Sequence, residues 1–173
     1  MSRLSLCLLL ALSACASGGH RANYVGGAIA LECAPFARAL SGVRLSGDAA
    51  DWWWQAGQRY DRSAQPAVGS VLVLRRSGRL PSGHVAVVSQ VIDRRQILVT
   101  QANWVHHRVS QDQPVTDISP GNDWSLVRVW WPPTGEMGTT AYPAFGFIRP
   151  ERPATHDQLV AATPRAIRLA ANE

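Results

Sequence analysis

The chain has 173 residues, of which 46% are hydrophobic and 17% are charged. This size and composition fit one folded domain and exclude a long disordered or fibrous protein. Seventeen arginines, with no lysine, outnumber twelve acidic residues and give a formal net charge of +5. A positive chain suits an anionic partner, but the arginines are scattered and form no basic run, so we expect no nucleic-acid binding.

Residues 1–15 are predicted to be an export signal with a lipobox. Arg3 precedes a short apolar stretch, which has about half the length that a membrane-spanning helix needs. The sequence Leu-Ser-Ala-Cys that ends at Cys15 is similar to a bacterial lipobox, in which the cysteine is lipidated. We therefore expect an exported protein, either a periplasmic or outer-membrane-anchored lipoprotein attached through Cys15 or a soluble secreted form.

The rest of the chain is predicted to form one domain with two flanking segments. Residues 16–28 are expected to be a flexible tether, residues 29–150 the domain, and residues 151–173 a peripheral C-terminal tail. Helices are predicted at 33–40 and 49–58, and strands at 70–74, 84–91, 96–100 and 126–131. Helices followed by antiparallel strands indicate the α+β class.

Cys33 is the first candidate for chemistry. Exported proteins usually pair their cysteines, whereas Cys33 has no obvious partner. One interpretation is a buried cysteine that acts as a small apolar side chain. The other is a nucleophile, because a thiol at a helix N-terminus is near unpaired N–H groups that favour the thiolate and can hold an oxyanion.

His84 is the candidate base for this nucleophile. It begins the most apolar strand of the chain, and Gly83 before it leaves space for another group to approach closely. The neighbouring antiparallel strand would bring Gln101 or Asn103 to His84, depending on the register. An amide oxygen there could orient the imidazole toward Cys33. The alternatives are a core histidine and an asparagine that simply forms a turn.

Several segments, in order, resemble the CHAP domain, the cysteine, histidine-dependent amidohydrolase/peptidase family of the NlpC-type and papain-like group. The resemblance covers roughly residues 29–150. The segments that carry it are Leu31–Arg38, Gly47–Ala49 with Trp52–Trp54, Pro66–Val73, Gly83–Val88 and Gln101–Trp104.

The resemblance implies a papain-like fold in which N-terminal helices pack on an antiparallel β-sheet. It also implies that Cys33 is the nucleophile, that His84 is the general base and that Asn103 orients His84, with Gln101 as the second choice. This sequence departs from the family at Gln101, where many members carry a glutamate. A glutamine accepts a hydrogen bond but cannot stabilise an imidazolium with a full negative charge.

The expected function is thiol-dependent hydrolysis of peptidoglycan, as an amidase or endopeptidase that forms a Cys acyl-enzyme. The alternative is a catalytically weak or inactive cell-wall-binding module. Trp104 and Trp54 are the candidate substrate-binding residues, since aromatic rings can stack on sugars. Three consecutive tryptophans cannot all face inward on a helix, so at least one of Trp52–Trp54 should be partly exposed.

No cofactor is expected, and the oligomeric state stays open. A metal site built from Cys33, His84, His106 and His107 is the weakest alternative, because these residues lack the spacing of common zinc sites. We therefore expect no metal ligands.

Overall fold

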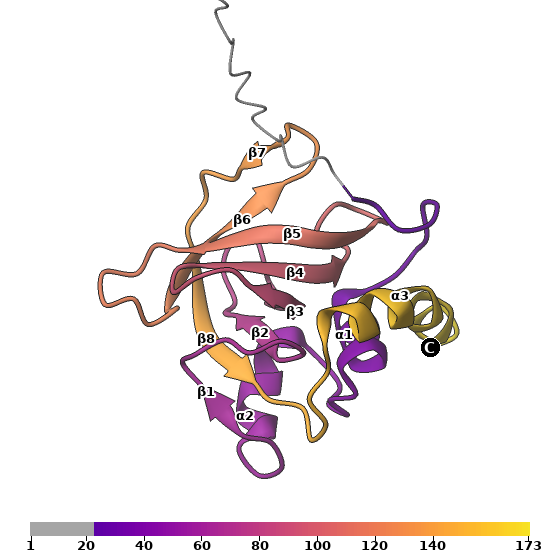
Figure 1. Cartoon of the computed structure of the whole chain (residues 1–173), viewed down its shortest axis with the longest axis horizontal. Coiled ribbons are helices and arrows are strands. Elements are labelled where there is room, and N and C mark those ends of the chain that lie inside the picture. Colours follow the sequence, from indigo (N-terminus) through magenta and orange to yellow (C-terminus); the bar gives the residue numbers. More distant parts are fainter. Residues whose placement is uncertain (1–22) are drawn as a thin grey trace, which may run out of the picture.

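The structure is a computed structural model that describes residues 23–173 (Figure 1). The predicted export signal, the lipidation at Cys15 and the first part of the tether lie outside the described residues. The elements, in order, are α1 (Cys33–Ser41), η1 (Ala49–Asp51), α2 (Trp52–Ala56), β1 (Arg62–Ser63), β2 (Val71–Leu74), β3 (His84–Val91), β4 (Gln96–Ala102), β5 (Val109–Asp117), β6 (Leu126–Trp131), β7 (Glu136–Met137), β8 (Tyr142–Ile148) and α3 (His156–Ala170). No helix in this part of the chain is long and apolar enough to cross a membrane.

The strands form an antiparallel sheet that closes into a barrel. Their order is β1-β8-β2-β3-β4-β5-β6-β7, and β8 pairs with β6 as well as with β2, which closes the ring. The helices α1 and α3 lie side by side against one wall of this barrel, and α2 lies near β1 (Figure 1). The predicted α+β class is confirmed, and the closure of the sheet is a feature that the sequence did not predict.

Alternation along the strands divides the core into two parts. On β3, Val85 and Val87 pack toward the helices, whereas Ala86 and Val88 belong to the core inside the barrel. His84 has the same parity as Ala86, so it lies at the end of the inward-facing row. His84 is therefore at the rim of the barrel, beside the wall that the helices cover.

Helix α1 begins and ends where the sequence predicted, within one residue. Pro35 lies in the first turn, where its missing N–H costs nothing. Gly42 follows the helix with φ 77°, and its N–H donates to the Arg38 carbonyl. The helix is anchored by Phe36 and Leu40, which are buried.

The second predicted helix differs from the prediction. Instead of one helix over 49–58, the chain forms the 3-10 helix η1 and the short helix α2. Asp48, which precedes η1, makes no side-chain capping hydrogen bond and pairs with Arg76 at 2.8 Å. Trp52 is completely buried and Trp54 is 64% exposed, which confirms that the three tryptophans do not all face inward.

The strands β2, β3, β4 and β6 match the predicted ranges to within two residues, but β5 and β8 were not predicted. In β5, Pro114 and the left-handed Asp112 (φ 53°) interrupt the usual strand pattern. Residues 151–173 contain α3, which buries Leu159 and Ala166 and packs against α1. At the other end, the described part of the tether is hydrogen-bonded to β5 through Val25 N–H and the Val109 carbonyl.

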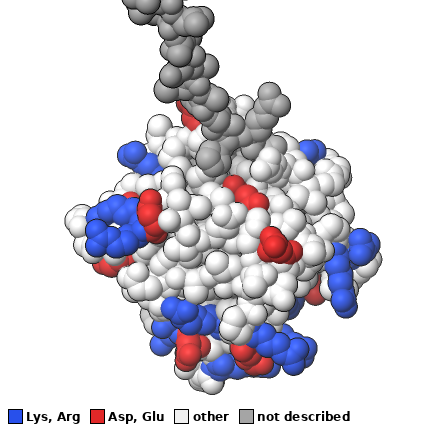
Figure 2. Space-filling view, viewed as in Figure 1, with Lys and Arg blue, Asp and Glu red and all other residues white. Residues whose placement is uncertain are grey.

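Charged side chains are dispersed over the surface. On the face shown in Figure 2, the arginines form separate groups toward the edges, several of them beside acidic residues, and the middle carries acidic side chains but no arginine. The net charge of +5 therefore does not produce a continuous basic band on this face.

Candidate active site

Cys33 lies at the N-terminus of α1, and its thiol interacts with the ring of His84 on β3. The preceding residue, Glu32, has an extended backbone, and Phe36 N–H is the first to bond back to it, at 3.4 Å. The first turn of a helix leaves its N–H groups without partners inside the helix. The amides of Cys33 and Ala34 are therefore available to stabilise negative charge near the sulfur.

His84 is buried, with 4% of its surface exposed, and lies between two partners. Its ring interacts with the Cys33 thiol, and its Nε2 lies 2.9 Å from Gln101 Oε1. Because an amide oxygen can only accept, Nε2 carries the hydrogen and donates it, which leaves Nδ1 for Cys33. A nucleophile next to a base that is oriented by a third group is the arrangement found in thiol hydrolases.

Gly83 allows the close packing that fixes the start of β3. It has φ 74°, and a Cβ placed on it would lie 2.7 Å from both Ala50 Cβ and the Leu74 carbonyl oxygen. A side chain at this position would push η1 away. The predicted close approach to Gly83 is thus present, and the approaching group is η1.

Of the two amides expected near His84, the structure places Gln101 against the ring. The β3–β4 register pairs Val87 with Thr100, and its extension would put residue 103 opposite His84. However, β4 ends at Ala102, and Asn103 adopts a left-handed backbone with φ 59°. Its side chain turns away from the ring and donates from Nδ2 to Glu32 Oε2 at 3.1 Å. Asn103 therefore contacts Glu32 and does not make the contact with His84 that was expected.

The pKa values of the pair shift in opposite directions. Burial alone raises the pKa of the Cys33 thiol, but the charge of His84 and hydrogen bonds from His84 and the Val85 N–H outweigh it and hold the pKa below its ordinary value. Burial alone lowers the pKa of His84, but the Cys33 thiolate and the hydrogen bond with Gln101 raise it above its ordinary value. Both shifts favour the thiolate–imidazolium pair.

One hollow borders Cys33, and a second is separated from His84 by the Trp104 ring. One of about 330 Å³ contains Cys33 and is lined by Glu32, Pro35, the loop 46–49 and Ser82. The other, of about 380 Å³, is lined by Trp104, Tyr142, Arg79 and Trp131, among others.

Trp104 and Tyr142 connect the second hollow to the pair. The Trp104 ring centroid is 5.1 Å from that of His84 and 5.2 Å from that of Tyr142. Trp104 therefore borders both the base and the hollow. The other tryptophan expected to bind substrate, Trp54, lines neither hollow and packs against Phe145.

His106 and His107 do not join the site. His106 and His107 stack on each other, with ring centroids 3.6 Å apart, and His84 is bonded to Cys33 and Gln101. Within residues 23–173 there is no group of three or more His, Cys, Asp or Glu side chains that could hold a metal ion.

Glu32 is the site residue to which the sequence analysis gave no role. Its carboxylate lines the hollow beside Cys33 and raises the pKa of both Cys33 and His84 by its charge. Its position directly before the nucleophile was visible in the sequence. Its contact with Asn103 joins two segments that are far apart in the chain, so this contact was not visible in the sequence.

Residues 22–103 match the family model of the CHAP domain, and this range includes Cys33, His84 and Gln101. Among solved structures, two of Ly7917 are similar, one of them with the hydrolyzing product of MDP; each is 16% identical, with TM-scores of 0.38 and 0.39. The alignments cover 73% of this chain but only 57% and 58% of those chains. No curated protein matches the sequence. The match of residues 22–103 confirms the resemblance of this part of the chain to the CHAP domain.

Proposed function

We propose that this chain is a thiol-dependent peptidoglycan hydrolase in which Cys33 attacks an amide bond and His84 is the general base. The observation that carries the proposal is the contact of Cys33 with His84, and of His84 with Gln101, at the edge of a hollow. A lowered thiol pKa and an oriented imidazole are what thiol-based acyl transfer requires. The CHAP family supports amide hydrolysis, and peptidoglycan is the substrate of most of its members.

The first step forms the acyl-enzyme. The Cys33 thiolate attacks the carbonyl carbon of the amide, a C–S bond forms, and the negative charge moves to the carbonyl oxygen. The N–H groups of Cys33 and Ala34 would hold this oxyanion at the start of α1. The His84 imidazolium then gives its proton to the amide nitrogen, the C–N bond breaks and the amine leaves.

The second step releases the acid. Neutral His84 removes a proton from a water molecule, whose oxygen attacks the thioester carbon and displaces the Cys33 thiolate. The product leaves as an acid, and His84 again carries a proton beside the thiolate. Throughout, Gln101 keeps Nε2 protonated and Nδ1 directed at the sulfur.

We also propose that the site is arranged as in a papain-like fold. A helix brings the nucleophile, and a strand of the packed sheet brings the base, as the sequence analysis expected. Both an amidase, which cuts the link between glycan and peptide, and an endopeptidase, which cuts within the peptide, fit this chemistry.

The second candidate is a wall-binding module with weak or no activity. It is favoured by the neutral side chain of Gln101, because a charged partner for His84 would stabilise the imidazolium more strongly. Such a module would bind peptidoglycan equally well after loss of the thiol.

We propose in addition that the chain is exported and anchored to a membrane through a lipid on Cys15. In bacteria expressing the full chain, we expect the protein in the membrane fraction and labelled by a radioactive fatty acid. The Cys15→Ala variant should lose the label and become soluble. A labelled Cys15→Ala protein would contradict the lipobox.

One experiment tests the enzymatic proposal. Purified protein starting at Ala16 is incubated with peptidoglycan, and the soluble products are analysed by mass spectrometry beside the Cys33→Ala and Cys33→Ser variants. We expect fragments from the unmodified protein only, and their masses identify the bond. If none of the proteins releases fragments while all bind the wall, the binding module is the correct function.

A further inference from the structure

The hollow beside Cys33 contains one carboxylate that is not neutralised by a cation. Of the described residues that line it, Glu32, Asp48 and Arg38 are charged. Asp48 is paired with Arg76 at 2.8 Å, and Arg38 is paired with Glu173 and also donates to the Leu45 carbonyl. Among the described residues Glu32 forms no ion pair, and its charge acts on His84 only through space, so the carboxylate faces the hollow without a paired cation.

Glu32 is held in place by a neutral group. Asn103 Nδ2 donates to Glu32 Oε2 at 3.1 Å, and Asn103 Oδ1 accepts from the His107 N–H at 3.1 Å. The amide of Asn103 is thus fixed at both ends, and it orients the carboxylate without cancelling its charge. The second carboxylate oxygen, Oε1, keeps its capacity to accept from a ligand.

The position of Glu32 determines which part of a substrate it can meet. Glu32 directly precedes the proposed nucleophile Cys33 in the chain, so their Cα atoms are about 3.8 Å apart. A group that reaches its carboxylate must belong to a residue next to the amide that Cys33 attacks. The chain as a whole carries +5, yet the charge offered to the substrate at this point is negative.

We infer that Glu32 recognises a primary ammonium group of the substrate, carried by a residue adjacent to the amide that is cut. This inference rests on the proposed function, because it specifies the substrate of the same site. An ammonium has three donors and a compact charge, which suits a carboxylate that is fixed in place and partly solvated. Asn103 is then a positioning residue that acts through Glu32.

The test compares two forms of one substrate. Soluble muropeptides are prepared from peptidoglycan by a glycan-cleaving enzyme, and half of them are acetylated on their free amines. Their binding to the Cys33→Ala protein is measured by calorimetry, which needs no activity. We expect the free amines to bind about fivefold more tightly than the acetylated ones. The double variant Cys33→Ala/Glu32→Gln should bind both forms with equal affinity.

A matched control is Asp48→Asn in the Cys33→Ala protein, because Asp48 lines the same hollow but is paired with Arg76. It should keep the preference for free amines. Equal binding of both forms to the Cys33→Ala protein, or a preference that survives Glu32→Gln, would overturn the inference. If the amine preference is found and depends on Glu32 but the unmodified protein cuts no peptidoglycan, Glu32 recognises an ammonium group of a bound ligand and the proposed hydrolase fails.

Discussion

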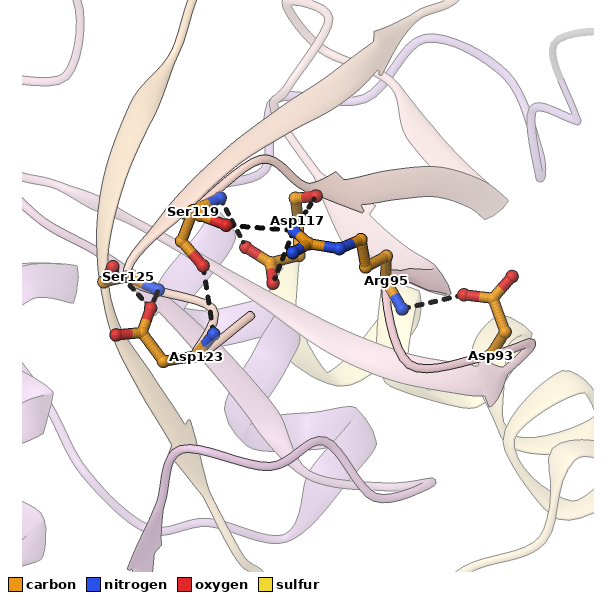
Figure 3. A network of polar contacts seen from close by, with 6 residues as sticks. All are labelled: Asp93, Arg95, Asp117, Ser119, Asp123 and Ser125. Carbon is orange, nitrogen blue, oxygen red and sulfur yellow. Dashed lines mark hydrogen bonds and ion pairs between the residues drawn. The ribbon is translucent and has the colours of Figure 1, made fainter. Parts of the chain in front are cut away.

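Two clusters of hydrogen-bonded side chains are anchored on the strands of this molecule, and they differ in where their hydrogen bonds end. The first, which we call the catalytic cluster after its proposed role, consists of Cys33, His84 and Gln101. The loop cluster consists of Arg95, Asp117, Ser119, Asp123 and Ser125 (Figure 3).

The loop cluster fixes the connection between β5 and β6. Buried Asp117 accepts from the Ser119 N–H at 2.8 Å, and Arg95 donates to the Ser119 carbonyl at 2.9 Å (Figure 3). Asp123 accepts from the hydroxyl and the N–H of Ser125, and these two bonds lower the pKa of Asp123. Most of these bonds have a backbone group at one end, so they hold a turn in shape.

In the catalytic cluster the bonds run from side chain to side chain and end at a thiol that borders a hollow. Both clusters contain a group whose pKa is shifted, so a shifted pKa alone does not identify an active site. The distinguishing features are a nucleophile, a base with a fixed tautomer, and space for a substrate. This comparison predicts that the first cluster controls activity and the second controls stability.

The largest expected effect is that of His84→Ala. Without the base, the rate of peptidoglycan cleavage should fall on the order of a thousandfold or more. The thiol should also lose its reactivity, because the pKa of Cys33 rises when the charge of His84 is removed. Initial rates and the rate of alkylation by iodoacetamide at neutral pH measure the two effects. Unchanged alkylation would mean that His84 does not activate Cys33.

Substitution of Gln101 should have a smaller effect and change the pH dependence. The hydrogen bond from His84 to Gln101 raises the pKa of His84, so Gln101→Leu should lower that pKa and lose the imidazolium at lower pH. We expect a loss of activity of about ten- to a hundredfold, and the alkaline limb of the pH–rate profile should move to lower pH.

Gln101→Glu is the matched variant and should act in the opposite direction. A negative charge beside Nε2 favours the imidazolium, so the alkaline limb should move to higher pH. The pH–rate profiles of the three proteins check both signs. If both variants move the limb in the same direction, the bond between His84 and residue 101 does not control the base.

Asp117→Ala should lower the stability of the protein and leave its activity nearly unchanged. Loss of a buried carboxylate that accepts from the loop backbone should lower the free energy of unfolding by about 2 kcal/mol. Activity per folded molecule should stay within about twofold, because the substituted side chain lies in the loop cluster. Thermal denaturation and initial rates at 20 °C measure the two quantities, and a large loss of activity with an unchanged melt would remove the distinction between the clusters.

The smallest expected effect is that of Asn103→Gly. Glycine keeps the left-handed backbone at this position but loses the amide that holds Glu32. We expect the preference for free amines over acetylated ones to fall about two- to threefold, with cleavage of the acetylated form unchanged. The ratio of kcat/KM for the two substrates measures this. An equal loss on both substrates would assign Asn103 a purely structural role.

The fold was predictable where local signals were strong. The helix at Cys33 has a proline in its first turn and a glycine at its end, and β3 is a run of apolar β-branched residues. The strand β5 could not be predicted, because Pro114 and Asp112 disfavour a strand and only the pairing with β4 and β6 compensates for them. Closure of the barrel likewise depends on β8 reaching both β2 and β6.

The sequence by itself determined the chemical identities: a lone thiol at a helix start, a histidine at a strand start, and two amides on the following strand. Only the tertiary structure decided which amide meets the histidine. β4 ends at Ala102 with Gln101 against His84, and the left-handed Asn103 then directs its amide to Glu32. The physical reason is that one backbone dihedral at the end of a strand redirects a side chain, and long-range packing sets that dihedral.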